Sequence, residues 1–181
     1  NPLLLSFFAD DLKTKGLQVA PLSLLDGNIP ANTGVIIIAA PQSAILPPEL
    51  KKLGAWINQG GQILWLQDPQ SAPQPELAQL LGVEWRPGYV MYPKFEEQEL
   101  PHPSYLYARP NSQNSLAQKL SSNVLMAQAS SPQAIDGSGW QSDSLLLSYA
   151  PAFISNNLAQ LEPQAGSSIG AFDLAISLER P

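Results

Sequence analysis

The sequence predicts an α/β domain with a mostly parallel sheet. The first observation is the apolar, β-branched run Val35–Ala40, which is typical of a strand covered on both faces. A second apolar run, Gln62–Gln67, follows a helical segment, Pro47–Gln59, whose apolar residues share one face. A helix between two buried strands predicts parallel pairing through a right-handed crossover. We therefore expect both strands to lie side by side at the centre of one sheet.

The other elements of the first half follow from helix periodicity and from Gly and Pro punctuation. Apolar residues at helical spacing predict a helix over Pro2–Lys15, which Gly16 ends. A short strand is expected at Gln18–Leu22, and the Gly- and Pro-containing segment Asp26–Thr33 is expected to be a loop. A further helix, Pro75–Leu81, stops at Gly82 and leads into a strand at Val83–Trp85.

The pattern weakens after Trp85. The segment Pro93–Pro110 is rich in proline and aromatic residues and is expected to be loop or sheet edge. A helix is expected at Ser112–Leu120. Alternating or continuous apolar runs predict four strands, at Tyr89–Tyr92, Val124–Ala127, Leu145–Tyr149 and Ile169–Leu178.

The length of 181 residues suits one domain. We expect residues 1–181 to form a single α/β domain, with residues 1–86 as the parallel-sheet core and residues 87–181 completing the sheet. Because the chain opens directly in a helix, a preceding strand is expected upstream. The chain is therefore interpreted as a fragment of a longer, membrane-anchored protein, and the sheet edge left open favours a homodimer.

Charge and cysteine content exclude several classes of function. The net charge is −6, and no basic cluster is present, which argues against nucleic-acid binding and against docking on an anionic membrane. The chain has no cysteine, which excludes disulfides, thiolate catalysis and cysteine-based zinc sites. No pattern of metal-ligand spacing is found, and no cofactor is expected.

One stretch, residues 35–69, is specific enough to suggest a family. It reads VIIIAAPQSAILPPELKKLGAWINQGGQILWLQDP: a strand ending in Ala-Pro, a Pro-Glu helix start, an aromatic-containing helix, a Gly-Gly turn and a strand ending in Asp-Pro. This order resembles the auxiliary components of ABC-type transport systems of the gliding-motility kind. Weaker matches follow at His102-Pro103, Ser122–Leu125, Gly137–Trp140, Ser144–Ser148 and Gly170–Ile176, where Ala171 stands in place of the family's Pro.

The resemblance implies a three-layer sandwich, similar to class I glutamine amidotransferases and to flavodoxin. It also implies a non-catalytic, extracytoplasmic or periplasmic domain, anchored to the inner membrane through segments outside this chain. Its partners would be the membrane and ATPase subunits of the transporter.

Residues just past the two central strands are the candidate ligand-binding residues, because ligands of open α/β sheets bind beyond the carboxyl ends of strands. They are Gln42 and Ser43 after the first strand, and Asp68 and Gln70 after the second. A structural interpretation stands beside this one, in which Asp68 only caps its own loop. Ser43 lacks the glycines of a nucleophile elbow, so we predict no catalytic residue there.

The histidine and three of the tryptophans also call for an interpretation. His102 is the only histidine and would have to serve any hydrolytic triad, but its flanking prolines favour a rigid structural loop. Trp56 and Trp65 are expected in the core. Trp140 follows a Gly-rich turn and is the candidate anchor of a protein interface.

Two other functions stay open at this point. A hydrolase or amidotransferase on the same fold is one, although an amidotransferase of this fold would need the missing cysteine. A carbohydrate-binding accessory domain is the other, suggested by Tyr89, Tyr92, Tyr105 and Tyr107.

Overall fold

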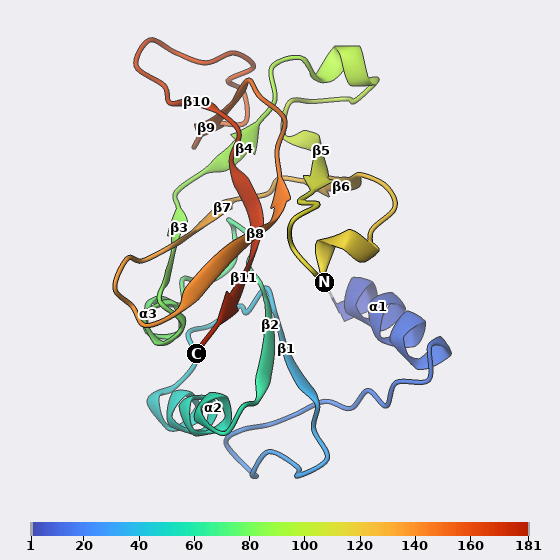
Figure 1. Ribbon diagram of the computed structural model, residues 1–181, viewed down its shortest axis with the longest axis vertical. Coiled ribbons are helices and arrows are strands. Elements are labelled where there is room, and N and C mark those ends of the chain that lie inside the picture. Colours follow the sequence, from blue (N-terminus) through green and yellow to red (C-terminus); the bar gives the residue numbers. More distant parts are fainter. Residues whose placement is uncertain (1, 181) are drawn as a thin grey trace.

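Residues 2–81 are built from helices around a pair of strands. The computed structural model describes residues 2–180, with side chains from Leu5 onward. Figure 1 shows α1, then β1, α2, β2 and α3 in chain order. Their bounds are Pro2–Thr14 for α1, Val35–Ala39 for β1, Pro47–Asn58 for α2, Gln62–Leu66 for β2 and Pro75–Leu81 for α3.

The predicted parallel pairing of the two apolar strands is confirmed. β1 and β2 run parallel in a register that places Ile36 beside Ile63 and Ile38 beside Trp65. The connecting helix α2 begins at a Pro-Pro pair, and the Glu49 carboxylate accepts the Leu46 backbone N–H at 2.9 Å, which satisfies a free donor at the helix start. The sequence therefore encodes a local β-α-β unit.

The predicted position of this pair at the centre of a sheet is wrong. β1 and β2 form a sheet of two strands within residues 2–180, so each has an open edge. The expectation of burial on both faces is also wrong, because only one face of the pair contributes to a core.

The remaining strands are antiparallel (Figure 1). They form three sheets, in the strand orders β3-β7, β10-β9-β4 and β11-β8-β5-β6. Their bounds are Val83–Arg86 for β3, Tyr89–Met91 for β4, Tyr105–Pro110 for β5, Val124–Ala127 for β6, Ser131–Ala134 for β7, Gln141–Leu147 for β8, Ala152–Ser155 for β9, Ile169–Gly170 for β10 and Asp173–Glu179 for β11.

The predicted mostly parallel three-layer sandwich, similar to class I glutamine amidotransferases or flavodoxin, is therefore corrected. The described chain has one parallel pair and otherwise antiparallel sheets. Parallel strands need a crossover of a dozen or more residues, usually a helix. After α3 the described helices are single 3₁₀ turns, Phe95–Gln98 and Ala117–Lys119, so the later strands connect through loops instead.

Three local predictions also fail. The segment Pro93–Pro110, expected to be loop or sheet edge, contains β5, which lies between β8 and β6 in its sheet. Residues Gln18–Leu22 form no strand. The helix predicted at Ser112–Leu120 is reduced to the 3₁₀ turn at Ala117–Lys119. There the buried Asn114 side chain accepts the backbone N–H groups of Leu116 and Ala117, a local bond that competes with a longer helix.

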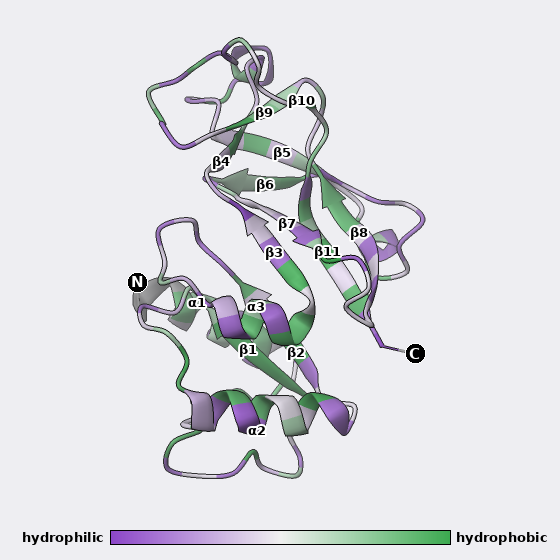
Figure 2. Cartoon of the chain, turned by 90° about the vertical axis from the view of Figure 1, so that its left-hand side faces the viewer, coloured by the Kyte–Doolittle hydropathy of each residue, from purple (hydrophilic) through white to green (hydrophobic). Residues whose placement is uncertain are grey.

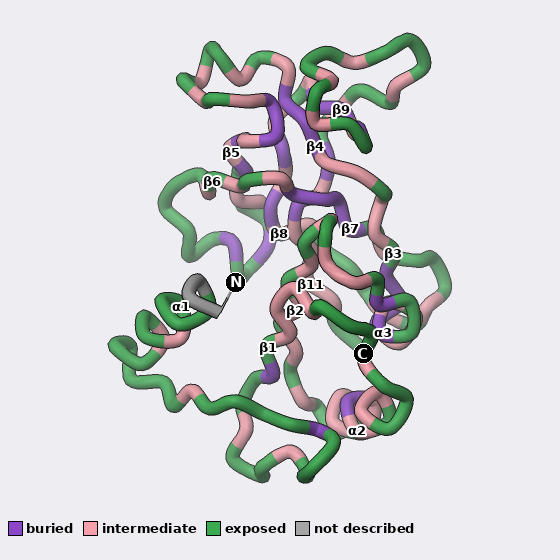
Figure 3. Tube along the Cα trace, turned by 180° about the vertical axis from the view of Figure 1, so that it is seen from behind, coloured by how far each residue is buried: buried purple, intermediate pink, exposed green. Residues whose placement is uncertain are grey.

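The structure has two hydrophobic cores, and Figure 3 shows the buried residues gathered mainly in the antiparallel part. The first core lies among the antiparallel strands and includes Val90, Leu106, Phe172 and Leu174. The second lies between the β1–β2 pair and its helices, and is centred on Leu53, Leu77, Leu81 and Val83. Trp56 and Trp65 pack against the second core in partly buried positions.

None of the helices in residues 2–180 combines the length and the apolar character that crossing a membrane requires.

Gly82 allows a matched test of the junction after α3. Its φ is +62°, and a Cβ there would lie 2.4 Å from Ser138 Cβ, whereas Gly137 has φ +75° and nothing within 4 Å of a Cβ. Both substitutions to alanine cost the left-handed strain of about 1–2 kcal/mol. We expect Gly82→Ala to lower the free energy of unfolding by roughly 1–3 kcal/mol more than Gly137→Ala, because only Gly82 is overpacked. Urea denaturation measures both, and equal losses would contradict the packing described here.

Candidate functional site

The loops that follow β1 and β2 meet at the carboxyl end of the parallel pair, and one buried side chain joins them. Gln74 is 5% exposed. Its Oε1 accepts the Ile45 N–H at 2.9 Å, and its Nε2 donates to the carbonyl of Ser43 at 2.8 Å and to that of Ala72 at 3.1 Å. The Ala72 N–H also donates to the Pro41 carbonyl at 3.0 Å. These bonds fix the two loops relative to one another.

The four predicted ligand-binding residues lie on these loops, and all are exposed. Gln42 donates from Nε2 to the Ala40 carbonyl at 2.9 Å. Asp68 accepts the Gln70 N–H at 2.7 Å, which is the loop-capping arrangement of an Asx turn. Gln70 donates to the Tyr89 hydroxyl at 3.3 Å. Ser43 contributes its backbone carbonyl to the Gln74 bond. A ligand-binding role for these residues stays a prediction.

The side chains that organise this edge are Gln67 and Gln74, which the sequence reasoning missed. Gln67 Nε2 donates to Ser71 Oγ at 2.7 Å, and its Oε1 accepts from Trp65 Nε1 at 3.1 Å. Glutamines are common on protein surfaces, so composition alone does not mark them. The only available signal was position, since Gln67 directly follows β2 and Gln74 directly precedes α3.

His102 is held by hydrogen bonds on both ring nitrogens. Nδ1 lies 2.8 Å from Ser104 Oγ and 3.1 Å from the Ser104 N–H, and Nε2 lies 2.8 Å from the Leu158 carbonyl. A carbonyl accepts only, so Nε2 carries the proton and the Nδ1 lone pair accepts from Ser104. Ser104 is 1% exposed. The imidazole therefore has no free lone pair for base catalysis, and it ties the loop at residue 102 to the loop at residue 158.

Trp140 is only partly exposed. Its Nε1 donates to the Leu80 carbonyl at 3.2 Å, and the Arg180 guanidinium lies 4.4 Å from the centre of its ring. The ring also packs against the second core. An interface role for Trp140 stays a prediction, and it would have to use the part of the ring that these contacts leave open.

The tyrosines proposed for carbohydrate binding do not share a surface of one kind. Tyr92 is buried in the first core. Tyr105 and Tyr107 are half-buried and alternate with buried residues along β5, so they share the outer face of that strand. Tyr89 is partly buried and bonded to Gln70.

The outer face of the β1–β2 pair is apolar and open to solvent. Val35 is 48% exposed, Ile37 38%, Leu64 40% and Leu66 43%. The register pairs Ile37 with Leu64, and parallel partners point to the same face. Figure 2 shows the hydrophobic colouring of the two strands. This outer face, defined by Val35, Ile37, Leu64 and Leu66, is a contiguous apolar surface.

Helix α1 stands on the other side of the β1–β2 pair from α2 and α3 in the views of Figures 1 and 3. Its apolar side chains are nevertheless exposed, with Phe7 at 72%, Leu5 at 45% and Phe8 at 37%. The helix and the sheet face therefore each present apolar surface without covering one another.

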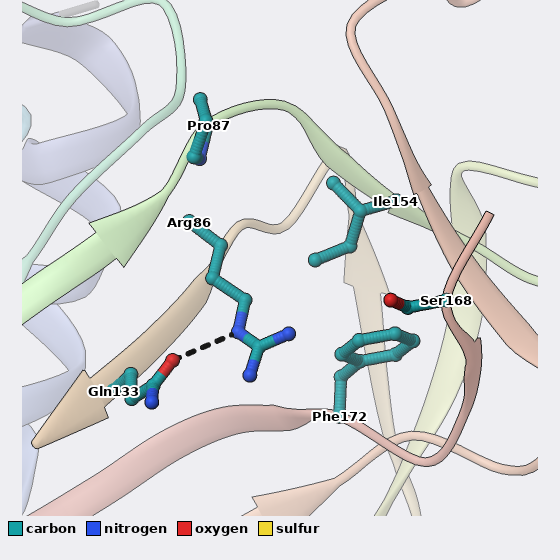
Figure 4. Close-up of a pocket in the computed structure, with 6 residues that line it drawn as sticks. All are labelled: Arg86, Pro87, Gln133, Ile154, Ser168 and Phe172. Atoms are coloured by element: carbon teal, nitrogen blue, oxygen red, sulfur yellow. Dashed lines mark hydrogen bonds between the residues drawn. The ribbon is translucent and has the colours of Figure 1, made fainter. Parts of the chain in front are cut away.

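A separate hollow of about 370 Å³ lies in the antiparallel part of the structure (Figure 4). Its lining is Arg86, Pro87, Gln133, Ile154, Ser168 and Phe172. No group of three or more His, Asp or Glu side chains within residues 2–180 is arranged to hold a metal ion.

Comparisons with known proteins define the fold and no more. No family model matches the chain, and no curated protein matches it. Among solved structures it is similar to the mmIFT52 N-terminal domain, with 13% sequence identity and a TM-score of 0.51. The match covers 71% of this chain and 63% of that chain, which is less than two thirds of it. The fold of the chain is thus similar to that of the mmIFT52 N-terminal domain.

The bridge at Gln74 is tested by Gln74→Ala. The substitution removes the hydrogen bonds to the Ile45 N–H and to the Ser43 and Ala72 carbonyls, each worth about 0.5–1.5 kcal/mol. We expect the free energy of unfolding to fall by roughly 2 kcal/mol or more. Gln42→Ala is the control, since an exposed side chain with one bond changes stability by about 0.5 kcal/mol or less. Equal effects in chemical denaturation would contradict the bridging role.

For His102 we expect a structural role. His102→Ala leaves the buried Ser104 hydroxyl unpaired, so the free energy of unfolding should fall by about 1–3 kcal/mol. We expect no turnover of ester, amide or glutamine substrates by the unaltered chain. Turnover that disappears in a folded His102→Ala variant would contradict this assignment.

Proposed function

We propose that the chain is a non-catalytic interaction module of an ABC-type transport system. In this proposal it acts outside the cytoplasm, is anchored to the inner membrane through segments beyond this chain, and contacts the membrane and ATPase subunits of the transporter. The observation that carries the proposal is the exposed outer face of the β1–β2 pair.

The outer face fits an amphipathic helix of a partner. Parallel strands are normally covered on both faces, and helices supply the cover. Here α2 and α3 cover one face, and the other leaves four large apolar side chains more than a third exposed. Covering each of them would contribute on the order of 1 kcal/mol.

The transporter as the source of this helix is supported by the sequence. Residues 35–69 form the β1-α2-β2 unit itself, and these are the residues that resemble the ABC-type auxiliary family. The motif and the exposed face are therefore parts of the same substructure. The hydrogen bonds that occupy His102 support a non-catalytic role.

Site-specific photo-crosslinking tests the proposal. A photoreactive phenylalanine analogue is placed at Ile37 or Leu64, and the chain is produced together with the membrane and ATPase subunits of a gliding-motility-type ABC transporter. We expect crosslinks to a transporter subunit from both positions. Leu116, 57% exposed and next to the Ala117–Lys119 turn, is the control position and should give none.

Leu64→Asp then serves as the matched variant, because a carboxylate on the outer face would have to be desolvated on binding. It should remove the crosslink from Ile37 while leaving the unfolding midpoint nearly unchanged, since Leu64 is 40% exposed. Crosslinks to α1 alone would make the chain's own helix the occupant, and crosslinks to a second copy would make it a homodimer face. Either result would overturn the transporter assignment.

A further inference from the structure

Arg86, the last residue of β3, is held in a fixed orientation beside the hollow of Figure 4. Its Nε donates to Gln133 Oε1 at 3.1 Å. Its Cζ lies 5.5 Å from the centre of the Phe172 ring, a cation–π distance. One hydrogen bond and one ring contact together set the direction of the planar guanidinium, so little side-chain freedom is left to lose when a ligand binds.

Four of the five N–H donors of a guanidinium sit on its two terminal nitrogens. At Arg86 these nitrogens have no hydrogen bond and no ion pair to any residue in the described range 2–180. The carboxylates of Glu84 and Asp173 belong to residues near Arg86, and neither forms an ion pair with it. Glu84 is on the same face of β3 two residues earlier, and Asp173 accepts the Ser144 hydroxyl. The two terminal nitrogens of the Arg86 guanidinium are therefore available to donate hydrogen bonds to a carboxylate.

The walls of the hollow indicate what should lie next to that carboxylate. Pro87, Ile154 and Phe172 form apolar parts of the lining, and Gln133 and Ser168 supply polar groups. Its volume of about 370 Å³ lies at the small end of ligand sites, which range from roughly 300 to 1,000 Å³. A group of one or two residues fits this space.

We propose that this hollow binds the carboxyl-terminal residue of a partner peptide whose last side chain is apolar. The terminal carboxylate accepts two parallel N–H bonds from Arg86, the bidentate geometry that arginine forms with carboxylates. The apolar side chain lies against Ile154 and Phe172. An Asp or Glu side chain fits less well, because the carbon next to its carboxylate is a methylene that carries no apolar side chain.

This site is separate from the outer face of β1 and β2, and its residues do not overlap with Val35, Ile37, Leu64 or Leu66. The inference therefore goes beyond the proposed function, and the two can fail independently. Because the chain carries a net charge of −6, long-range attraction does not favour anions. Recognition must come from the short-range hydrogen bonds that the Arg86 guanidinium donates.

The test uses two probes that differ only at the carboxyl terminus: acetyl-Ala-Leu as the free acid, and the same dipeptide as the amide. Binding to the full 181-residue chain is followed by NMR chemical-shift titration. We expect the free acid to shift resonances of Arg86, Gln133 and Phe172, and to bind about tenfold or more tightly than the amide.

Arg86→Gln should weaken binding of the free acid by about tenfold or more, and Arg86→Lys should restore only part of it because lysine lacks the fork. Arg109→Gln is the matched control, since Arg109 is exposed on β5 and lies outside the lining. Unfolding midpoints equal to that of the unaltered chain confirm that the variants are folded. If Arg86→Gln does not fold, Arg86→Lys still tests the proposal.

Three results would overturn the proposal: no binding of the free acid, equal binding of acid and amide, or unchanged binding by a folded Arg86 variant. Acetyl-Asp-amide is the third probe. If it binds as well as the free acid, the site takes any carboxylate, and the assignment to a chain terminus is wrong.

Discussion

The pairing of β11 with β8 is the interaction on which the rest of the structure depends, because β11 joins the two cores. Leu174 and the preceding Phe172 belong to the first core, among the antiparallel strands. Ile176 and Leu178 pack against the second core, between the β1–β2 pair and its helices. Register shifts lie between Asp173 and Ile176, at the point where the strand passes from one core to the other. β3 is a second link, because Val83 belongs to the second core and β3 pairs with β7, but β11 carries residues that pack against both cores.

Elements with clear boundary residues and the β1–β2 pairing could be predicted from the sequence, and the partners of the antiparallel strands could not. Val35–Ala39 and Pro75–Leu81 are recognised from contiguous apolar residues and from their Pro and Gly boundaries. By contrast, β7 contains a proline, and β8 begins with the polar residues Gln141–Asp143, whose partners lie at Ser177–Glu179. Pairing across such distances depends on how the whole chain packs, and no window of sequence contains that information.

The candidate sites, too, could be predicted where they follow from local sequence, and not where they depend on tertiary packing. Topology placed Ser43 and Asp68 at one edge, since the carboxyl ends of parallel strands coincide. The groups that hold those loops could not be found this way, because Gln74 is 31 residues from Ser43. Arg86 ends β3 and Phe172 lies between β10 and β11, so their contact follows only from the tertiary fold.

The two parts of the chain differ in how far they can stabilise themselves. The antiparallel strands enclose a core that includes Val90 and Ala152, both 0% exposed. A two-stranded sheet is marginal alone, and β1–β2 leaves one apolar face uncovered. A ligand that binds only the folded state stabilises it by mass action, so an occupant of the outer face would stabilise the α/β part most. Order in β1 and β2 is therefore coupled to occupancy of that face, and the surface proposed for interaction is also the part of the fold that gains most from a partner.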